Sequence, residues 1–174
     1  MMVYDAPEGE NSFRYQIAFD LQSNGNYLSL SPVYEVPGLG HDGDGAGVAI
    51  GDIDKNGRPD MILMGIDNPK GKNNFWYKVL YDIDENGYYS KESSILSISA
   101  EGWENSGGDI ALCDLNNNGI LDMVLLCTDK PTTAGRAYRW YYVAYDLKPD
   151  GHYNSLSSLN TICKNNIGVK YTVL

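Results

Sequence analysis

The sequence predicts an all-β protein made of four-stranded antiparallel sheets that recur along the chain, the arrangement of β-propeller blades. Three observations predict this class. Asp52 and its neighbours recur 62 residues later, at Asp114. Short β-rich runs are separated by glycine-containing turns, and no stretch keeps the 3.6-residue period of a helix for more than a turn or two. The 14 tyrosines and 19 glycines also suit many short strands joined by tight turns.

The repeat extends well beyond that one motif. A wider set of positions recurs at the same spacing, and a third copy follows after a two-residue insertion. Matches of this density do not arise by chance, and a period of this length is typical of solenoids, propellers and arrays. Examples are Asp20, Gly25 and Tyr27, which recur as Asp82, Gly87 and Tyr89 and again as Asp146, Gly151 and Tyr153.

The first two strands of each repeat are predicted to form a hairpin around an aspartate-rich loop. The second strand of the pair is apolar without alternation, as in residues 61–64. That pattern fits a strand covered on both faces, as in sheets packed between neighbouring sheets. The predicted hairpins join residues 47–53 to 61–66, and residues 109–112 to 123–127.

The third strand is long and aromatic, and the fourth is rich in serine and expected at the edge of the sheet. An Asn-Gly or Asp-Gly turn joins them, which is a strong hairpin signal because glycine accepts positive φ. Four antiparallel strands in about 62 residues make one propeller blade. The third strands are predicted at 13–20, 75–82 and 138–146, and the fourth at 27–36, 89–99 and 153–163.

These elements predict a single β-propeller-type repeat domain over residues 1–174. It holds about three blades' worth of strands, fewer than the four that a closed propeller usually needs. A homodimer that completes the propeller is one solution, and a segment of a longer protein is the other. The predicted parts are strands three and four of a blade at 11–37, full blades at 45–99 and 107–163, and an extra strand at 167–174.

Bulk properties exclude several classes of partner. The net charge is −10, so the chain is not expected to bind a nucleic-acid backbone or an anionic membrane surface. No apolar run approaches the ~20 residues that a membrane-spanning helix needs, and the N-terminus lacks the features of a signal peptide. The three cysteines make no disulfide framework. Cys113 is expected opposite Met123 and Cys127 opposite Asp109, so these two are not expected to pair.

The two aspartate-rich loops carry side-chain oxygens at the spacing of calcium ligands. Calcium prefers several hard oxygens, and oxygens at alternate positions of a short loop project to one side. Glycine at the sixth position allows the sharp turn, the seventh residue supplies a carbonyl, and an aspartate at the ninth closes the shell. The alternative is that the Asx residues only cap a turn. Two Ca²⁺ sites are predicted, from Asp52, Asp54, Asn56, Asp60 and the Arg58 carbonyl, and from Asp114, Asn116, Asn118, Asp122 and the Ile120 carbonyl.

The second loop has only two carboxylates, so we expect it to bind calcium more weakly than the first. The other acidic turns fit a metal less well. Asp82 and Asp84 resemble half of the motif, but the ninth position is Ser90. In the last copy Lys148 takes the third position, where a cation is poorly served. We therefore predict hairpin turns without metal at these places.

Residues 47–63 (GVAIGDIDKNGRPDMIL) and 109–125 (DIALCDLNNNGILDMVL) resemble FG-GAP/VCBS repeats. This is the repeat of integrin α-chain propellers and of many bacterial and fungal secreted proteins. The resemblance implies a β-propeller with calcium in the loop between a blade's first two strands, and an extracellular, cell-surface or periplasmic location. The Phe-Gly pair that names the family is absent, since Ala46-Gly47 and Gly108-Asp109 occupy its place. The resemblance fixes fold better than function.

The favoured function is a calcium-stabilised binding or adhesion module with a carbohydrate or protein ligand. Trp103 is the best candidate for a ligand contact, whereas Trp76 and Trp140 share a repeat position and are expected to pack between blades. A structural segment of a larger secreted or surface protein is the alternative. An enzyme is not expected, because neither His41 nor His152 belongs to a recognisable nucleophile arrangement. A polysaccharide-active site built from distant carboxylates is the least favoured hypothesis.

Overall fold

The computed structural model describes residues 2–5, 10–41, 45–66, 74–99, 105–129 and 136–166. Every regular element in these residues is a β-strand, and every strand pairing is antiparallel. The all-β prediction is therefore confirmed. In the described part of the chain there is no helix that could cross a membrane.

Each copy of the repeat forms its own sheet. The first sheet has the strand order β1-β2-β5, with a small β3–β4 hairpin beside it. The middle sheet has the order β10-β8-β7-β6, and β9 also pairs with β8. The elements of these two sheets are β1 (Met2–Asp5), β2 (Glu10–Tyr15), β3 (Ala18–Phe19), β4 (Ser29–Leu30), β5 (Tyr34–His41), β6 (Gly45–Gly51), β7 (Asp60–Ile66), β8 (Asn74–Tyr81), β9 (Lys91–Glu92) and β10 (Leu96–Ser99).

The third sheet repeats the plan of the middle one. Its strand order is β11-β12-β13-β14, and β15 also pairs with β13. In the middle and third repeats, predicted strands one to three each correspond to one observed strand, because the apolar runs and glycine turns that define them also bound the ladders. In the first repeat the strand predicted at 13–20 is divided into β2 and β3, which belong to different sheets. The elements are β11 (Asn105–Cys113), β12 (Asp122–Asp129), β13 (Arg136–Tyr145), β14 (Ser155–Leu156) and β15 (Asn160–Asn166).

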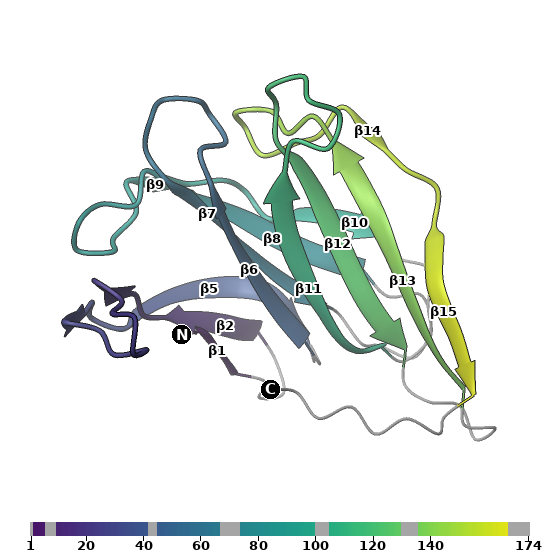
Figure 1. The fold of residues 1–174 in the computed structure, drawn as a ribbon, viewed down its shortest axis with the longest axis horizontal. Coiled ribbons are helices and arrows are strands. Elements are labelled where there is room, and N and C mark those ends of the chain that lie inside the picture. Colours follow the sequence, from purple (N-terminus) through teal and green to yellow (C-terminus); the bar gives the residue numbers. More distant parts are fainter. Residues whose placement is uncertain are drawn as a thin grey trace.

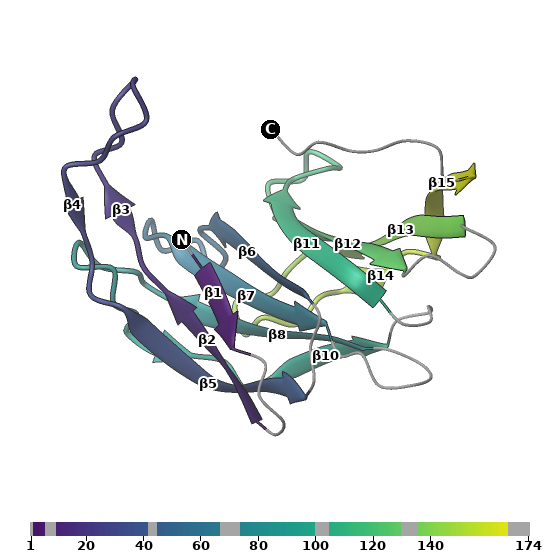
Figure 2. The ribbon, with the colours of Figure 1, turned by 90° about the horizontal axis from the view of Figure 1, so that it is seen from below.

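The middle sheet lies between the other two, as Figure 2 shows. One face of β7 and β8 packs on the first sheet, where Met61, Leu63 and Leu80 meet Phe13. The opposite face packs on the third sheet through a larger apolar cluster that includes Ile62 and Met64. Both faces of β7 are thus buried, as its unbroken apolar sequence predicts. The described residues form an open stack of sheets and not a closed ring (Figure 1).

The fourth strand of each repeat is split in two, so this part of the sequence prediction is wrong. In the middle sheet the break between β9 and β10 falls at Ser93. Its hydroxyl accepts the Val79 N–H at 3.0 Å and donates to the Ser94 carbonyl at 2.7 Å. Because a side chain takes the place of a backbone partner, the regular ladder stops there. Ser31 and Ser157 make the equivalent bonds in the other two repeats.

The register of the β11–β12 hairpin also differs from the prediction by one residue. Cys113 lies opposite Asp122 instead of Met123, and Cys127 lies opposite Gly108 instead of Asp109. The shift arises because Asp122 is itself the first residue of β12, held there by hydrogen bonds to both of its carboxylate oxygens. The two cysteines are nevertheless not paired with each other across the strands, as expected. The predicted extra strand at 167–174 and the side chain of Cys163 lie outside the described residues.

Candidate metal centres

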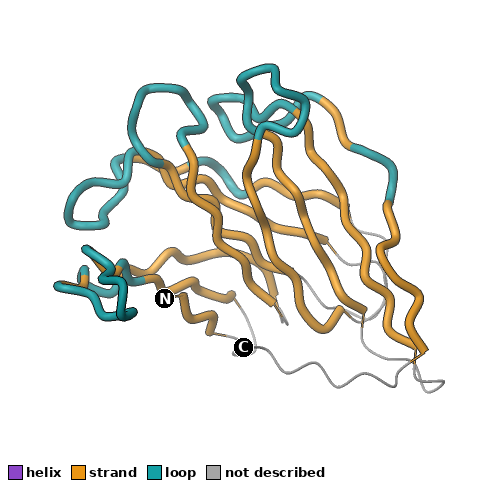
Figure 3. The backbone as a smooth tube through the Cα atoms, in the orientation of Figure 1, coloured by secondary structure: helices purple, strands orange, loops and turns teal. Residues whose placement is uncertain are grey.

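The two aspartate-rich loops and the β13–β14 turn lie at the same end of the sheets, as Figure 3 shows. In the first loop Lys55 and Gly57 have positive φ values of 59° and 85°. In the second loop Asn117 and Gly119 have 58° and 80° at the same positions. The glycines meet the expectation of a sharp turn at the sixth position. The positive φ at the fourth position could not be predicted in the first loop. A lysine rarely adopts the left-handed conformation, because it costs about 1–2 kcal/mol.

Asp52 organises the backbone of the first loop. Its Oδ1 accepts the Asn56 N–H at 3.0 Å, and its Oδ2 accepts the Gly57 N–H at 2.9 Å. Asn56 Oδ1 in turn accepts the Arg58 N–H at 2.8 Å. Each of these oxygens keeps a second lone pair, so the bonds that shape the loop leave the oxygens able to bind a cation. The role of the Arg58 carbonyl as a ligand stays a prediction.

Asp60 closes the first loop from inside the protein, with no exposed surface. Its Oδ2 accepts the Ile53 N–H at 2.7 Å, and its Oδ1 accepts the Asp82 N–H at 2.9 Å. Burial raises the pKa of Asp60 above its ordinary value, and the N–H groups of Asp82, Ile53 and Asp54 partly oppose that rise. A carboxylate buried in this way favours a neighbouring positive charge.

The first loop brings three carboxylates together. Asp52, Asp54 and Asp60 each offer an oxygen, and the three oxygens lie within 4.8 Å of one another. The Oδ1 atom of Asp54 is buried and has no hydrogen-bond partner among the described residues. Its other oxygen, Oδ2, lies 3.6 Å from the ammonium of Lys91, a side chain that is itself largely exposed. A divalent cation among the three acids would supply the partner that Asp54 Oδ1 lacks, so the residues fit a metal.

The second loop has the same frame with one carboxylate fewer. Asp114 accepts the N–H groups of Asn118 and Gly119 at 3.1 and 2.7 Å. Asn118 Oδ1 accepts the Ile120 N–H at 2.8 Å, as Asn56 does in the first loop. Asp122 is buried, and its Oδ2 accepts the Leu115 N–H at 2.9 Å. Asn116 replaces the third acid, so this loop gathers two carboxylates among its described residues.

Asp82 and Asp146 support the loops, and sequence reasoning missed this role. Asp82 Oδ1 accepts the side-chain amide of Asn56 at 2.6 Å, and Asp146 Oδ1 accepts that of Asn118 at 2.7 Å. Holding the amide nitrogen turns the amide oxygen toward the loop. Hydrogen bonds from Ser90 and Asn56 lower the pKa of Asp82 below its usual range. The available signal was their shared place in the repeat, directly after the third strand.

The remaining acidic turns are hairpin turns in the structure. Asp84 illustrates them, since its Oδ1 accepts the N–H groups of Asn86 and Tyr88. The Gly87 N–H donates to the Asp84 carbonyl at 2.9 Å, and Gly87 has a φ of 83°. These bonds satisfy the carboxylate within its own turn.

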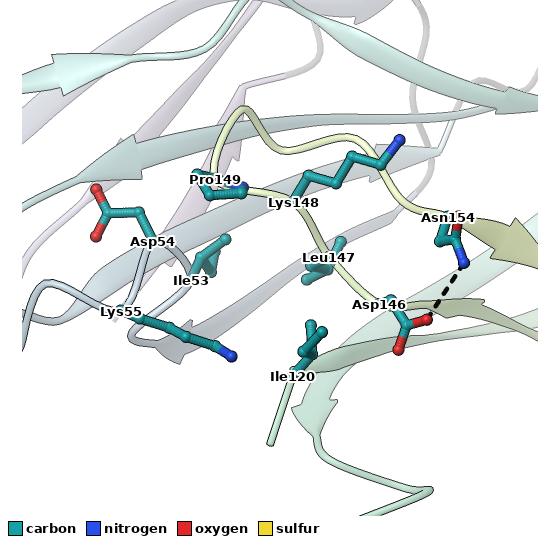
Figure 4. Close-up of a pocket in the computed structure, with 9 residues that line it drawn as sticks. All are labelled: Ile53, Asp54, Lys55, Ile120, Asp146, Leu147, Lys148, Pro149 and Asn154. Carbon is teal, nitrogen blue, oxygen red and sulfur yellow. Dashed lines mark hydrogen bonds between the residues drawn. The ribbon is translucent and has the colours of Figure 1, made fainter. Parts of the chain in front are cut away.

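A cleft of about 370 Å³ lies between the first loop, Ile120 of the second loop and the β13–β14 turn. Figure 4 shows its apolar residues Ile53, Leu147 and Ile120 in the middle and the charged ends of Asp54 and Lys148 around them. Because both candidate metal loops contribute to its wall, a bound cation would stiffen this cleft.

The tryptophans fall where their repeat position predicts. Trp140 is buried and meets Phe75 edge-on, with ring centroids 5.7 Å apart. Trp76 packs between the first and middle sheets. Both therefore serve inter-sheet packing, while Trp103 lies outside the described residues. The His152 ring is exposed, and its Nδ1 lies 3.3 Å from Asp150 Oδ1.

Comparison of the chain with protein-family models, with curated proteins and with solved structures gives no match.

Proposed function

We propose that this chain is a calcium-stabilised binding module of the β-propeller type, with one Ca²⁺ held by each aspartate-rich loop. The observation that carries the proposal is the cluster of Asp52, Asp54 and Asp60, whose oxygens approach within 4.8 Å of one another. Three carboxylates at that spacing repel each other unless a cation lies among them. All-oxygen donors of this kind suit Ca²⁺ better than softer metals.

The unpartnered oxygen of Asp54 separates this proposal from simple turn capping. Capping explains the bonds of Asp52 and Asn56, which are made to backbone N–H groups of their own loop. Capping does not explain a buried carboxylate oxygen that has no donor among the described residues. A cation does, and it also offsets the cost of burying Asp60.

The binding role follows from where these loops lie. They flank an apolar-floored cleft at one end of the sheets, so calcium would fix the shape of a surface open to a ligand. We infer a carbohydrate or protein ligand met outside the cell or in the periplasm, where calcium is abundant enough for loops of modest affinity. A structural role within a larger surface protein is the alternative, and it needs no ligand at this cleft.

The metal part of the proposal is tested by thermal unfolding with calcium and with EGTA. A ligand that binds only the folded state stabilises it, by about 2.7 kcal/mol at a hundredfold excess over Kd. We expect calcium to raise the Tm and EGTA to lower it. Asp52→Ala should remove one of two calcium equivalents in calorimetric titration and spare the other. An exposed turn acid, Glu85→Ala, is the matched control and should leave both equivalents in place.

A melting curve that does not respond to calcium, in protein first shown to be free of metal, would overturn the metal assignment. The binding part is tested separately with a glycan array read with calcium and with EGTA. Calcium-dependent binding to a glycan class supports the recognition role. Calcium stabilisation without any glycan binding favours the structural alternative or a protein ligand.

A further inference from the structure

The two junctions between neighbouring sheets share one construction. At each, a buried tyrosine of the earlier repeat donates its hydroxyl to the carbonyl of a glycine in the later repeat's hairpin turn. Tyr15 bonds Gly87 and Tyr77 bonds Gly151, both at 3.0 Å. A junction thus joins a tyrosine face on one repeat to a glycine-turn face on the next.

The described residues leave the tyrosine face of the third repeat uncovered. Tyr141 holds the position of Tyr15 and Tyr77, yet its hydroxyl makes no hydrogen bond among the described residues. With Val124, Leu126 and other side chains it lines an apolar hollow of about 380 Å³. The same face is buried in the middle repeat. Ile162 is 57% exposed, whereas its counterpart Ile98 in the middle repeat is 2% exposed.

The glycine-turn face of the first repeat is uncovered too. A Cβ placed on Gly87 would lie 3.1 Å from Ile17 of the preceding repeat, whereas one placed on Gly25 would meet no atom within 4 Å. Leu21 is 73% exposed, while its counterpart Leu147 is 3% exposed beneath the middle sheet. The chain therefore exposes both halves of the junction that it builds twice internally.

We propose that a second copy of this chain docks here, with the tyrosine face of one copy against the glycine-turn face of the other. Tyr141 of one copy then donates its hydroxyl to the Gly25 carbonyl of the next. Pairing of two tyrosine faces would leave that hydroxyl without its carbonyl and Gly25 still open. Continuity with the internal junctions favours the head-to-tail contact, which is heterologous. None of these residues belongs to the aspartate-rich loops, so the inference does not depend on calcium.

The new junction is weaker than the internal ones. The Phe75–Trp140 ring contact is replaced by Arg139 on one face and Arg14 on the other, where Arg14 already pairs with Glu35 at 3.1 Å. The two guanidinium groups repel each other, although Glu35 partly offsets the charge of Arg14 and salt screens the repulsion, so this part of the contact contributes less than buried rings. Association is thus expected to be reversible and to depend on concentration.

Charge substitutions on each face test the inference by sedimentation velocity, from about 1 to about 200 µM protein. Leu21→Glu blocks the glycine-turn face and Leu126→Glu blocks the tyrosine face. Each variant alone should stay monomeric, and an equimolar mixture should recover a dimer, because each still offers the face that the other has lost. Leu28→Glu is the matched control. Leu28 is 72% exposed, but its counterparts Ser90 and Asn154 are exposed as well, so this variant should associate like the wild type.

Far-ultraviolet circular dichroism and Tm establish that each variant is folded. The Tyr141→Phe variant keeps the aromatic ring and removes only the hydroxyl that is proposed to bond Gly25. Loss of that one hydrogen bond should weaken association about fivefold. A wild type that stays monomeric at the highest concentration overturns the inference. So does a Leu21→Glu variant that dimerises like the wild type, because that result identifies tyrosine-face pairing. A mixture that does not associate overturns it as well.

Discussion

The two aspartate-rich loops have the same backbone and different charge. Both place positive φ at the fourth and sixth residues, and both anchor a buried aspartate to the N–H that follows the third strand. They differ at the third position, where Asp54 in the first loop corresponds to Asn116 in the second. The residue next to the third position differs as well. Lys91 lies beside Asp54 in the first loop, and the corresponding residue near the second loop is Ser155.

This difference separates what shapes the loop from what binds the ion. The residues at the first, fifth, sixth and ninth positions are shared and make the hydrogen bonds that fold the loop. The third position differs between the loops: Asp54 Oδ1 has no partner among the described residues, whereas Asn116 Oδ1 accepts the Asn118 N–H at 3.0 Å. Both loops have positive φ at the same two positions with either residue there, so the third residue sets the number of carboxylates and not the loop's shape. Ligand charge is a main determinant of calcium affinity.

The largest expected effect comes from breaking the shared frame. Asp60→Ala leaves the N–H groups of Ile53 and Asp82 without their acceptor, and Asp122→Ala does the same in the second loop. We expect each to lower the free energy of unfolding by about 3 kcal/mol, even in EGTA. Urea unfolding measures it. A loss below about 1 kcal/mol in either loop would show that its frame does not rest on the buried acid.

An exchange of the third position should exchange the calcium affinities. Asp54→Asn gives the first loop the carboxylate count of the second, and Asn116→Asp does the reverse. We expect a change on the order of tenfold in each Kd, in opposite directions, with little change in stability in EGTA. Isothermal titration calorimetry resolves the two sites. Equal affinities before and after the exchange would contradict the division between shape and charge.

The smallest effect concerns Lys91. Its ammonium lies 3.6 Å from Asp54 Oδ2 and 4.6 Å from the centre of the Tyr81 ring, so it competes with a cation for the first loop. Lys91→Ser copies the residue at this position beside the second loop and should tighten calcium binding in the first loop by at most about threefold, because the Lys91 side chain is largely exposed. The second loop of the same variant is the internal control. Weaker calcium binding in the first loop would mean that Lys91 supports the site.

Much of the fold could be predicted because the repeat shows the same elements several times. The apolar run at 61–64 identified a strand buried on both faces, and the Asn-Gly turns located the hairpins. The split of the fourth strand could not be predicted, since it depends on the Ser93 hydroxyl replacing a ladder partner. Serine also occurs in intact strands, so its presence alone carries no such signal.

The sequence predicted the candidate metal ligands but not the residues that hold those ligands in place. Oxygen spacing located Asp52, Asp54 and Asp60, which the fold does bring together. The support from Asp82 depends on a contact across 26 positions of the chain. Spacing within a nine-residue motif cannot reveal such a contact, although the recurrence of an aspartate at that place in every repeat could have indicated it.

The interrupted outer strands have a consequence for how copies of this protein meet. A long regular strand at a margin offers unpaired backbone groups to any other extended chain, and this is the usual route to amyloid-like growth. Here Ser31, Ser93 and Ser157 turn their hydroxyls onto that backbone and divide each margin into a piece of 2 residues and a longer piece of 4 to 8 residues. Uncontrolled lateral growth is thereby discouraged, while the broad sides of the terminal sheets stay free for ordered contact.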